Sequence, residues 1–437
     1  MFFWVATAIF IVAYGLIVSE KLDKTKVALA GACLMIVLKI VDQHEVFYEE
    51  KYAIDYNVIF LLIGMMIIVH ILSKTGIFQF LAIKSAKIAR GNPLLILFSF
   101  ACMTASISSL LDNVTTILLF TPVTLYIADE LELDPFPFLF AEVMASNIGG
   151  AATLIGDPPN IMIGSKVHLT FMDFVYHITP AVLFIFPFFL FTLKCMFGKK
   201  LHVREEVKQK ILAINEYTLI KDHNLLIKTL SVLGVVILGF ILHGVLHYEP
   251  ATIALLGAAI LLIISRENPH NTLRELEWPT IFFFIGLFII VGGVVKVGLI
   301  SKLSEGMIVL TKPSAESMFA TSIVTLWFSA VGSAIVDNIP FVASMIPLLT
   351  DTAHTILPWG IIQHPTIMPV WWSLTLGSCL GGNATPVGAS ANVIAVGLAA
   401  KAGYPISFKK FVFYAIPITV ETIAISNIYI WLRYYVL

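Results

Sequence analysis

The sequence is poor in charge and in cysteine. Only 13% of its 437 residues are Asp, Glu, Lys or Arg, and the formal net charge is −1. No basic stripe stands out, so nothing indicates a nucleic-acid partner. The chain has neither a CxxC pair nor Cys/His ligand spacing, which argues against a disulfide framework and a zinc site. The motifs HExxH and GxSxG are also missing, so we expect no enzyme activity, no metal site and no cofactor.

Apolar side chains are abundant instead. Hydrophobic residues make up 58% of the chain and the mean hydropathy is +0.92, values that a soluble domain could not carry without an apolar surface. The sequence therefore predicts an all-α polytopic membrane protein in the lipid bilayer. The apolar N-terminus lacks preceding basic residues and a cleavage pattern, so we expect a retained first span. Since about 20 apolar residues cross a bilayer, the predicted spans are 2–18, 26–41, 57–73, 173–196, 224–247, 250–264, 279–295 and 411–432.

A polar, glycine-rich stretch occurs twice in this apolar sequence. Residues 147–160 read NIGGAATLIGDPPN, and residues 379–392 read CLGGNATPVGASAN. A second motif is also repeated, since LDNV at 111–114 is matched by VDNI at 336–339. The general likeness of apolar helices explains matched Ile, Leu and Phe, but not polar and glycine positions in register. The sequence therefore predicts an internal duplication, which is typical of secondary transporters.

Loop charge indicates how the two halves are oriented. We expect re-entrant helical hairpins at 94–127 and 317–350 and broken helices at 136–166 and 369–400. The halves, 1–196 and 224–437, then have five transmembrane helices each. An odd number makes them inverted repeats, joined by a cytoplasmic linker at 197–223. With both termini outside, most of the 27 Lys and Arg fall in inner loops, as the positive-inside rule requires.

The competing topology has hairpins that span the membrane fully. It would place the basic linker outside together with both termini, which fits the loop charges less well. We therefore expect a multi-pass protein of the cell inner (plasma) membrane, and the short linker suggests a bacterial source.

The predicted helix breaks are where chemistry is expected. Backbone groups freed inside a membrane must face protein or a polar cavity, and each half-helix N-terminus offers N–H donors and a partial positive charge. Asp157, followed by two prolines, is a good N-cap. Asp112 and Asp337 can cap the second arms of the hairpins, and Thr385 or Ser390 can cap the last half-helix.

Carboxylates at this depth cost about 2.5–3.5 kcal/mol each on the insertion scale, so the three aspartates are functional candidates. Two readings stay open for them: capping alone, or capping combined with binding of a coupling ion, H⁺ or Na⁺. For Glu142 and Glu421 we expect snorkelling or capping, with Glu142 near an entrance. His70 and His243 are expected to be packing residues rather than proton relays.

The four motifs, at 111–122, 147–160, 337–341 and 381–392, together resemble those of the ion transporter superfamily. The chain is similar to the branch of ArsB-type arsenite/antimonite permeases and the pink-eyed dilution (P) protein. This resemblance implies inverted repeats, an elevator mechanism, a homodimer and, as a further partner, a cytoplasmic ATPase subunit. It also implies that these motifs form hairpin tips and unwound binding loops. We predict that residues of the motifs and their neighbours bind substrate or ion: Asp112, Asn113, Thr115, Thr116, Asn147, Gly149, Gly150, Thr153, Gly156, Asp157, Asn160, Asp337, Asn338, Gly381, Gly382, Asn383, Thr385, Gly388, Ser390 and Asn392.

Within this resemblance, efflux of arsenite or antimonite by proton antiport is the favoured function. Arsenite at neutral pH is a small neutral trihydroxy acid, whose hydroxyls can meet Asp and carbonyl acceptors while helix N-termini meet its oxygens. Cys379 could bind trivalent arsenic, but tight thiolate binding would slow release. A Na⁺/H⁺ antiporter and an anion or dicarboxylate transporter stay open as alternatives, although no arginine lies in the predicted site. An ion channel would need a continuous polar lining, which two central clusters do not supply.

Overall fold

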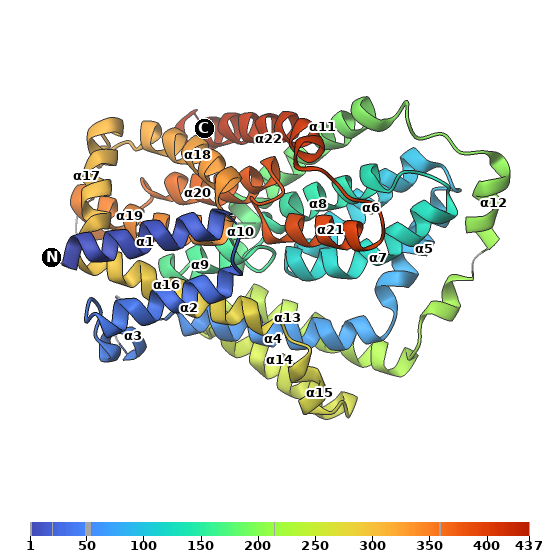
Figure 1. Ribbon diagram of the computed structural model, residues 1–437, viewed down its shortest axis with the longest axis horizontal. Helices are drawn as coiled ribbons and strands as arrows, with labels where there is room; N and C mark the ends of the chain where they lie inside the picture. The colour runs from blue at the N-terminus through green and yellow to red at the C-terminus, as the bar shows by residue number, and fades with distance from the viewer. Residues whose placement is uncertain (1, 20, 49–53, 214, 358–359, 437) are drawn as a thin grey trace.

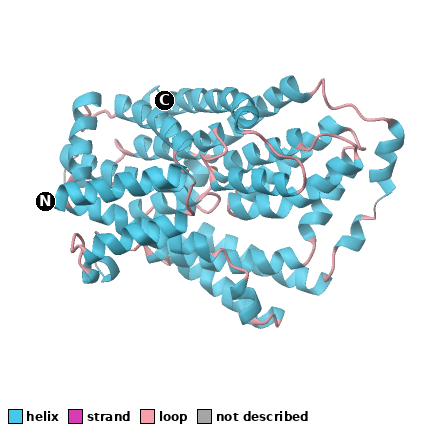
Figure 2. Cartoon of the chain, viewed as in Figure 1, coloured by secondary structure: helices cyan, strands magenta, loops and turns pink. Residues whose placement is uncertain are grey.

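The computed structural model describes residues 2–19, 21–48, 54–213, 215–357 and 360–436 (Figure 1). Within these ranges the chain consists of helices and connecting turns, and no strand is present (Figure 2). The predicted halves, 1–196 and 224–437, and the predicted linker, 197–223, are thus described except at the few positions between these ranges. The prediction of an all-α polytopic protein is confirmed.

The helices of the first half follow the apolar runs of the sequence. They are α1 (Phe2–Ser19), α2 (Lys24–Val37), α3 (Gln43–Tyr48), α4 (Tyr56–Lys74), α5 (Ile77–Ile88), α6 (Pro93–Ser108), α7 (Asn113–Glu130), α8 (Phe136–Gly150), α9 (Pro158–Val167), α10 (Phe171–His177) and α11 (Thr179–Phe197). The stretch predicted as a linker holds α12 (Glu205–Ala213) and the short 3₁₀ helix η1 (Glu216–Leu219).

The second half has a similar order, but among the described residues no helix lies between α21 and α22, where α10 lies between α9 and α11. Its helices are α13 (His223–Leu246), α14 (Pro250–Ser265), α15 (Pro269–Arg274), α16 (Trp278–Lys296), α17 (Leu299–Thr311), α18 (Phe319–Ile335), α19 (Asn338–Ile356), α20 (Met368–Gly381), the 3₁₀ turn η3 (Gly382–Ala384), α21 (Ser390–Lys401), α22 (Phe408–Trp431) and the π-helical turn η4 (Leu432–Val436). The N-terminus, α3 and α17 lie at one end of the molecule, and α5 and α12 lie at the other (Figure 1).

Among the described residues, six helical segments are long and apolar enough to cross a membrane: α1, α4, α11, α13, α16 and the last one, Phe408–Val436. Two predicted spans differ from the structure. The span predicted at 26–41 is a helix of 14 residues that ends at Val37, because Lys39 adopts a left-handed conformation and stops it. The span predicted at 173–196 begins only at Thr179, since residues up to His177 belong to α10, which has its own capping box at Thr170 and Asp173.

Helices of one half pack against helices of the other, and these contacts come in repeat-related pairs. Helix α4 lies against α14 and α16 against α2, while α9 lies against α19 and α21 against α7. Glycines permit two of these close contacts: a Cβ on Gly64 would lie 2.7 Å from the Ala254 carbonyl carbon, and one on Gly286 would lie 2.6 Å from that of Ala28. The middle of the molecule is therefore built from segments of both halves.

Candidate functional site

The helix breaks of both halves meet in the middle of the fold. Helix α6 ends at Ser108 and α7 begins at Asn113, while α18 ends at Ile335 and α19 begins at Asn338. Next to these turns, α8 stops at Gly150 and α9 begins at Pro158, and α20 and η3 are followed by α21 from Ser390. We call residues 151–157 and 385–389 the first and second loop.

The glycines of the repeated motif allow backbones to approach one another. A Cβ on Gly149 would lie 2.5 Å from the Ala105 Cα, and one on Gly381 would lie 2.5 Å from the Ala330 carbonyl oxygen. Within the first loop, a Cβ on Gly156 would lie 2.5 Å from the Gly150 carbonyl oxygen. None of these glycines has a positive φ. The motif is thus explained by close packing of α8 on α6 and of α20 on α18, with Gly150, Gly382 and Gly388 equally crowded.

Hydroxyl groups fasten each loop to the hairpin of its own half. Thr385 donates a hydrogen bond of 2.7 Å to the Ala334 carbonyl, and Thr153 donates one to the carbonyl of Ser109. Ser108 and Ser333 add bonds of 2.7 Å to the carbonyls of Ser146 and Ser378. Because these bonds recur in both halves, they account for the registered polar positions of the motif.

The terminal asparagine of each motif closes its loop. Asn160 donates from Nδ2 to the carbonyls of Gly150, Ala151 and Thr153 at 3.3, 3.1 and 2.8 Å. Asn392 does the same for Gly382 and Thr385, both at 2.8 Å. These amides therefore satisfy backbone carbonyls that the broken helices leave without partners.

Four asparagines from both halves form a chain of hydrogen bonds at the centre. Asn113 donates from Nδ2 to Asn147 Oδ1 at 2.9 Å, and Asn147 Nδ2 donates to Asn383 Oδ1 at 2.8 Å and to Asn392 Oδ1 at 2.9 Å. The Asn383 Nδ2 is buried and has no hydrogen-bond partner among the described residues. We call Asn113, Asn147, Asn383 and Asn392 the asparagine network.

The aspartates of the hairpins cap helices, as the capping hypothesis requires. Asp112 accepts from the Thr115 backbone N–H at 2.8 Å and from its hydroxyl at 2.6 Å. The Thr116 hydroxyl donates to the Asp112 carbonyl at 2.9 Å. Asp337 accepts from the Ile339 N–H at 3.1 Å. Each carboxylate oxygen can accept more than one hydrogen bond, so capping does not exhaust their capacity.

The caps of α9 and α21 differ from the prediction in part. Asp157 is the N-cap residue of α9, as predicted, but its side chain makes no cap bond, because Pro159 has no N–H and the Asn160 N–H donates to the Asp157 backbone carbonyl at 2.9 Å. Its oxygens instead accept from Asn338 Nδ2, each at 3.2 Å. Helix α21 has Ala389 as its N-cap residue, so neither Thr385 nor Ser390 caps it. The Thr385 hydroxyl instead accepts from Gly388 N–H at 3.0 Å.

The family of the chain follows from its similarity to known proteins. Residues 14–377 match the sequence model of the CitMHS citrate transporter family. The chain belongs to this family. It is a multi-pass membrane transporter, and the predicted membership of the ion transporter superfamily is confirmed.

Relatives of this CitMHS chain agree with that assignment. An uncharacterized transporter of Mycobacterium tuberculosis is 45% identical over 99% of both chains. The human P protein is 34% identical over 98% of this chain, which spans 59% of the P protein. The predicted likeness to the P protein is thus confirmed.

Two solved structures share the fold. The chain is similar to MtrF of Neisseria gonorrhoeae, described within a class of antimetabolite efflux pumps, with a TM-score of 0.62, 12% identity, and coverage of 93% of this chain and 85% of that one. It is also similar to the YdaH transporter of Alcanivorax borkumensis, with a TM-score of 0.53, 13% identity, and coverage of 99% and 98%.

The structure adds a cation to the centre of this CitMHS transporter that sequence reasoning missed. Lys24, the first residue of α2, donates from Nζ to Asp337 Oδ2 at 2.8 Å and to Ser390 Oγ at 2.6 Å. Ser390 in turn donates to Asp337 Oδ2 at 2.6 Å. Lys24 is 313 residues from Asp337 in sequence, so nothing local signals the contact. The predicted inner-loop lysine is therefore also part of the site.

A cavity leads from the surface to this ion pair. It has a volume of about 380 Å³ and is bordered by Asp23, Lys24, Val114, Glu277, Asp337 and Ser390, among others. We call it the lysine vestibule. It gives water and small solutes a route to the second hairpin tip.

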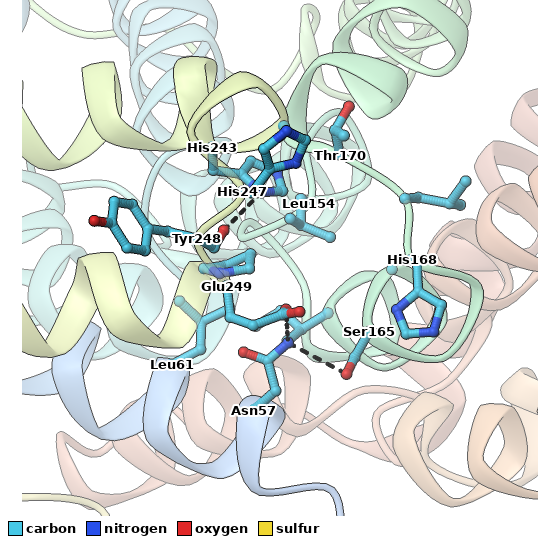
Figure 3. Close-up of a pocket in the computed structure, with 15 residues that line it drawn as sticks. Asn57, Leu61, Leu154, Ser165, His168, Thr170, His243, His247, Tyr248 and Glu249 are labelled. Carbon is cyan, nitrogen blue, oxygen red and sulfur yellow. Dashed lines mark hydrogen bonds between the residues drawn. The ribbon is translucent and has the colours of Figure 1, made fainter.

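A second cavity, of about 320 Å³, is bordered mainly by residues of α4, α9 and the α13–α14 turn (Figure 3). We call it the histidine vestibule because His168, His243 and His247 border it. Asn57 connects its walls, donating to Glu249 Oε2 at 2.9 Å and to Ser165 Oγ at 3.4 Å. Unlike the lysine vestibule, this cavity has no hairpin-tip aspartate in its lining.

The structure also shows the contacts of three further polar residues singled out in the sequence. His243 is a packing residue, as expected, since its Nε2 accepts from the Phe171 N–H at 3.0 Å. Cys379 is buried and its thiol donates to Asn160 Oδ1 at 3.4 Å. Glu142 does not lie at an entrance: its side chain is fully buried between α7 and α8, so snorkelling is excluded for it.

Proposed function

We propose that this CitMHS transporter exports arsenite or antimonite in exchange for protons. The observation that supports this best is the asparagine network, which presents neutral amide donors and acceptors at the centre. The cation that the described residues bring to the second hairpin tip, Lys24, is already paired with Asp337. A small neutral polyhydroxy acid can exchange hydrogen bonds with such amides without bringing a charge that must be compensated.

The coupling role belongs, in this proposal, to the hairpin aspartates. Asp112 has no ion-pair partner among the described residues, whereas Asp337 is held by Lys24. A carboxylate at membrane depth without a cation is a site where a proton or Na⁺ is stabilised. Asp112 would therefore bind the coupling ion, while Asp337 would exchange Lys24 for substrate contacts during the cycle.

An elevator mechanism between inverted repeats is consistent with where the contacts lie. The hairpins and broken helices pack mainly on one another, and Lys24 on α2 reaches across to them from outside that group. If both termini are outside, the loop that holds Lys21, Lys24 and Lys26 is cytoplasmic, and the lysine vestibule opens inward. The homodimer, the ATPase partner and the plasma-membrane location stay predictions.

A carboxylate substrate is the second candidate, and Lys24 is the observation that favours it. An ammonium group beside the N-termini of α19 and α21 could bind a di- or tricarboxylate if it left Asp337. Sodium–proton exchange would use the same aspartates without an organic substrate. The central position of the polar residues still disfavours a channel.

A transport screen separates these candidates. Purified protein in proteoliposomes would be offered arsenite, antimonite, citrate, Na⁺ and chloride, each with and without an imposed pH gradient. The proposal predicts that arsenite or antimonite moves and that the pH gradient drives it. Movement of citrate alone would replace it with the second candidate, and movement of Na⁺ alone would identify a sodium–proton antiporter.

A further inference from the structure

One buried acid lies outside the site described so far. Glu142 is in the middle of α8 and its side chain is 0% exposed. Thr124 on α7 donates to Glu142 Oε1 at 2.5 Å. The other oxygen, Oε2, has no hydrogen-bond partner among the described residues.

No charge compensates this carboxyl. The elements packed against α8 are α6, α7, α11, α20, η3 and α21, and α22 adds aromatic contacts to Phe140. No described residue on these elements forms an ion pair with Glu142. Their titratable or charged groups are Cys102, Asp112, Tyr126, Asp129, Glu130, Lys194, Cys195, Cys379, Lys401, Lys409, Lys410, Tyr414, Glu421 and Tyr429.

Burial of a carboxylate with a single hydrogen bond costs several kcal/mol, and binding of a proton removes that cost. A fully buried acid with one free oxygen is therefore better suited to hold a proton than to hold a fixed charge. Thr124 supplies a hydroxyl that can donate to the carboxyl oxygen in either protonation state.

Glu142 lies close to the asparagine network along its own helix. Asn147 follows five residues later, which is about 7.5 Å along an α-helix axis. On α7, Thr121 lies one turn closer to Asn113 than Thr124 does, and its buried hydroxyl also has no partner among the described residues. Polar groups thus extend from Glu142 toward the centre of the site.

The opposite direction is closed by apolar side chains. Leu139, one turn before Glu142 on α8, packs with Leu125 and Ala399. Beyond this layer is a surface cavity of about 220 Å³, bordered by Leu139, Asp134, Tyr404 and Lys410. An apolar layer therefore lies between the acid and this cavity.

The acid also belongs to one half only. At the offsets that align the motifs, Glu142 corresponds to Leu374 and Thr124 to Leu349. Leu374 and Leu349 are fully buried in the second half. Leucine can therefore fill both positions of this helix contact. The Glu142–Thr124 pair is thus not needed to build this type of helix contact.

We propose that Glu142 is a proton-carrying residue, separate from the substrate site, that takes up and releases a proton by way of the asparagine network. The carboxylate binds one H⁺ at Oε2 when the centre faces one side of the membrane and returns it to water in the centre when it faces the other. The layer of Leu125, Leu139 and Ala399 prevents the proton from escaping directly to the surface. This inference rests on the proton coupling of the proposed function.

The test compares Glu142→Gln with Glu421→Gln in the full-length protein. Glu421 is a matched control, because Thr192 donates to its two oxygens at 3.0 and 2.8 Å across another helix pair. In proteoliposomes, arsenite accumulation driven by a pH gradient should be lost in Glu142→Gln, while exchange of labelled for unlabelled arsenite should continue. Both activities should persist in Glu421→Gln. Retained gradient-driven accumulation in Glu142→Gln would overturn the proposal.

A second measurement needs no substrate. The infrared C=O band of a buried protonated carboxyl should be present in the wild type and in Glu421→Gln, shift in Thr124→Val, and be absent in Glu142→Gln. If the wild type does not move arsenite, the proposed function fails. The infrared band would still show whether Glu142 is protonated. A band unchanged by Glu142→Gln would refute the inference, and Thr124→Val provides the readout if the glutamine variant does not fold.

Discussion

Replacing Gly149 with alanine tests whether the glycine motif is a packing device. The added Cβ would lie 2.5 Å from the Ala105 Cα and 2.6 Å from its carbonyl carbon, and closer still to its carbonyl oxygen. These are backbone atoms of α6, so no side-chain rotation can relieve the overlap. Helices α6 and α8 would have to separate, which stretches the 2.7 Å bond from Ser108 to the Ser146 carbonyl.

The expected cost can be worked from these contacts. Overpacking costs about 1–3 kcal/mol and a lost hydrogen bond about 0.5–1.5 kcal/mol, so Gly149→Ala should destabilise the protein by about 1.5–4.5 kcal/mol. The matched control is Gly397→Ala on α21, where an added Cβ has no atom within 4 Å. In a helix this change should stabilise slightly, by up to about 1 kcal/mol.

The assay is the fraction of detergent-purified protein that stays monodisperse after heating. Gly149→Ala should lose this fraction at a clearly lower temperature than the wild type, and Gly397→Ala should not. Equal midpoints for the two variants would refute the packing explanation and favour a role of Gly149 in loop flexibility.

Three further predictions concern charged side chains. Asp112→Asn should abolish coupled transport in folded protein, because the amide does not take up a proton near neutral pH and has no negative charge to compensate a cation, and Asp337→Asn should do the same; flux measurements check both. Lys24→Met should lower stability by about 1–2 kcal/mol, less than for a fully buried pair because the Lys24 side chain is 31% exposed, and should reduce transport. A hydrogen bond from the Lys87 ammonium lowers the pKa of Glu216. At a pH above the ordinary pKa of the carboxyl, this ion pair thus stabilises the docking of η1 on α5. The stabilisation is lost as the pH falls through the lowered pKa of Glu216. Proteolysis in the linker should therefore increase at such low pH in the wild type, and already at neutral pH in Glu216→Gln.

Control variants exist for the Lys24 and Glu216 predictions. Lys26→Met removes an exposed lysine of the same helix and should leave stability and transport unchanged. Glu205→Gln changes an exposed linker carboxylate that pairs with Lys208 of the same helix and should not alter cleavage at neutral pH. Wild-type coupled rates in both aspartate variants would reduce these residues to helix caps.

The positions of the helix breaks could be predicted because they depend on local sequence. Proline, glycine and capping residues interrupt apolar runs, and the repeated motif shows which interruptions correspond. The capping role of Asp112 follows from the residues next to it. The same local rule places Asp157 at the N-cap of α9 correctly but does not predict that its side chain makes no cap bond, since Pro159 removes one N–H and the Asn160 N–H donates to the Asp157 backbone carbonyl.

Contacts between distant segments could not be predicted in this way. Lys24 was expected only in an inner loop, yet it pairs with Asp337 across 313 residues. The asparagine network joins Asn147 to Asn383 and Asn392 of the other half, which depends on how the halves pack. From the sequence, Glu142 is expected near an entrance at the membrane surface. Only the packing of α7 against α8 shows that its side chain is buried.

Arsenite-dependent proton movement tests the central claim most directly. Everted vesicles that contain the protein would be loaded with a pH-sensitive dye, acidified inside, and then exposed to arsenite outside. The account predicts that arsenite accumulates and that the vesicle interior becomes alkaline as it does so, with no response in Asp112→Asn. Arsenite accumulation without alkalinisation, or no arsenite accumulation at all, would contradict it.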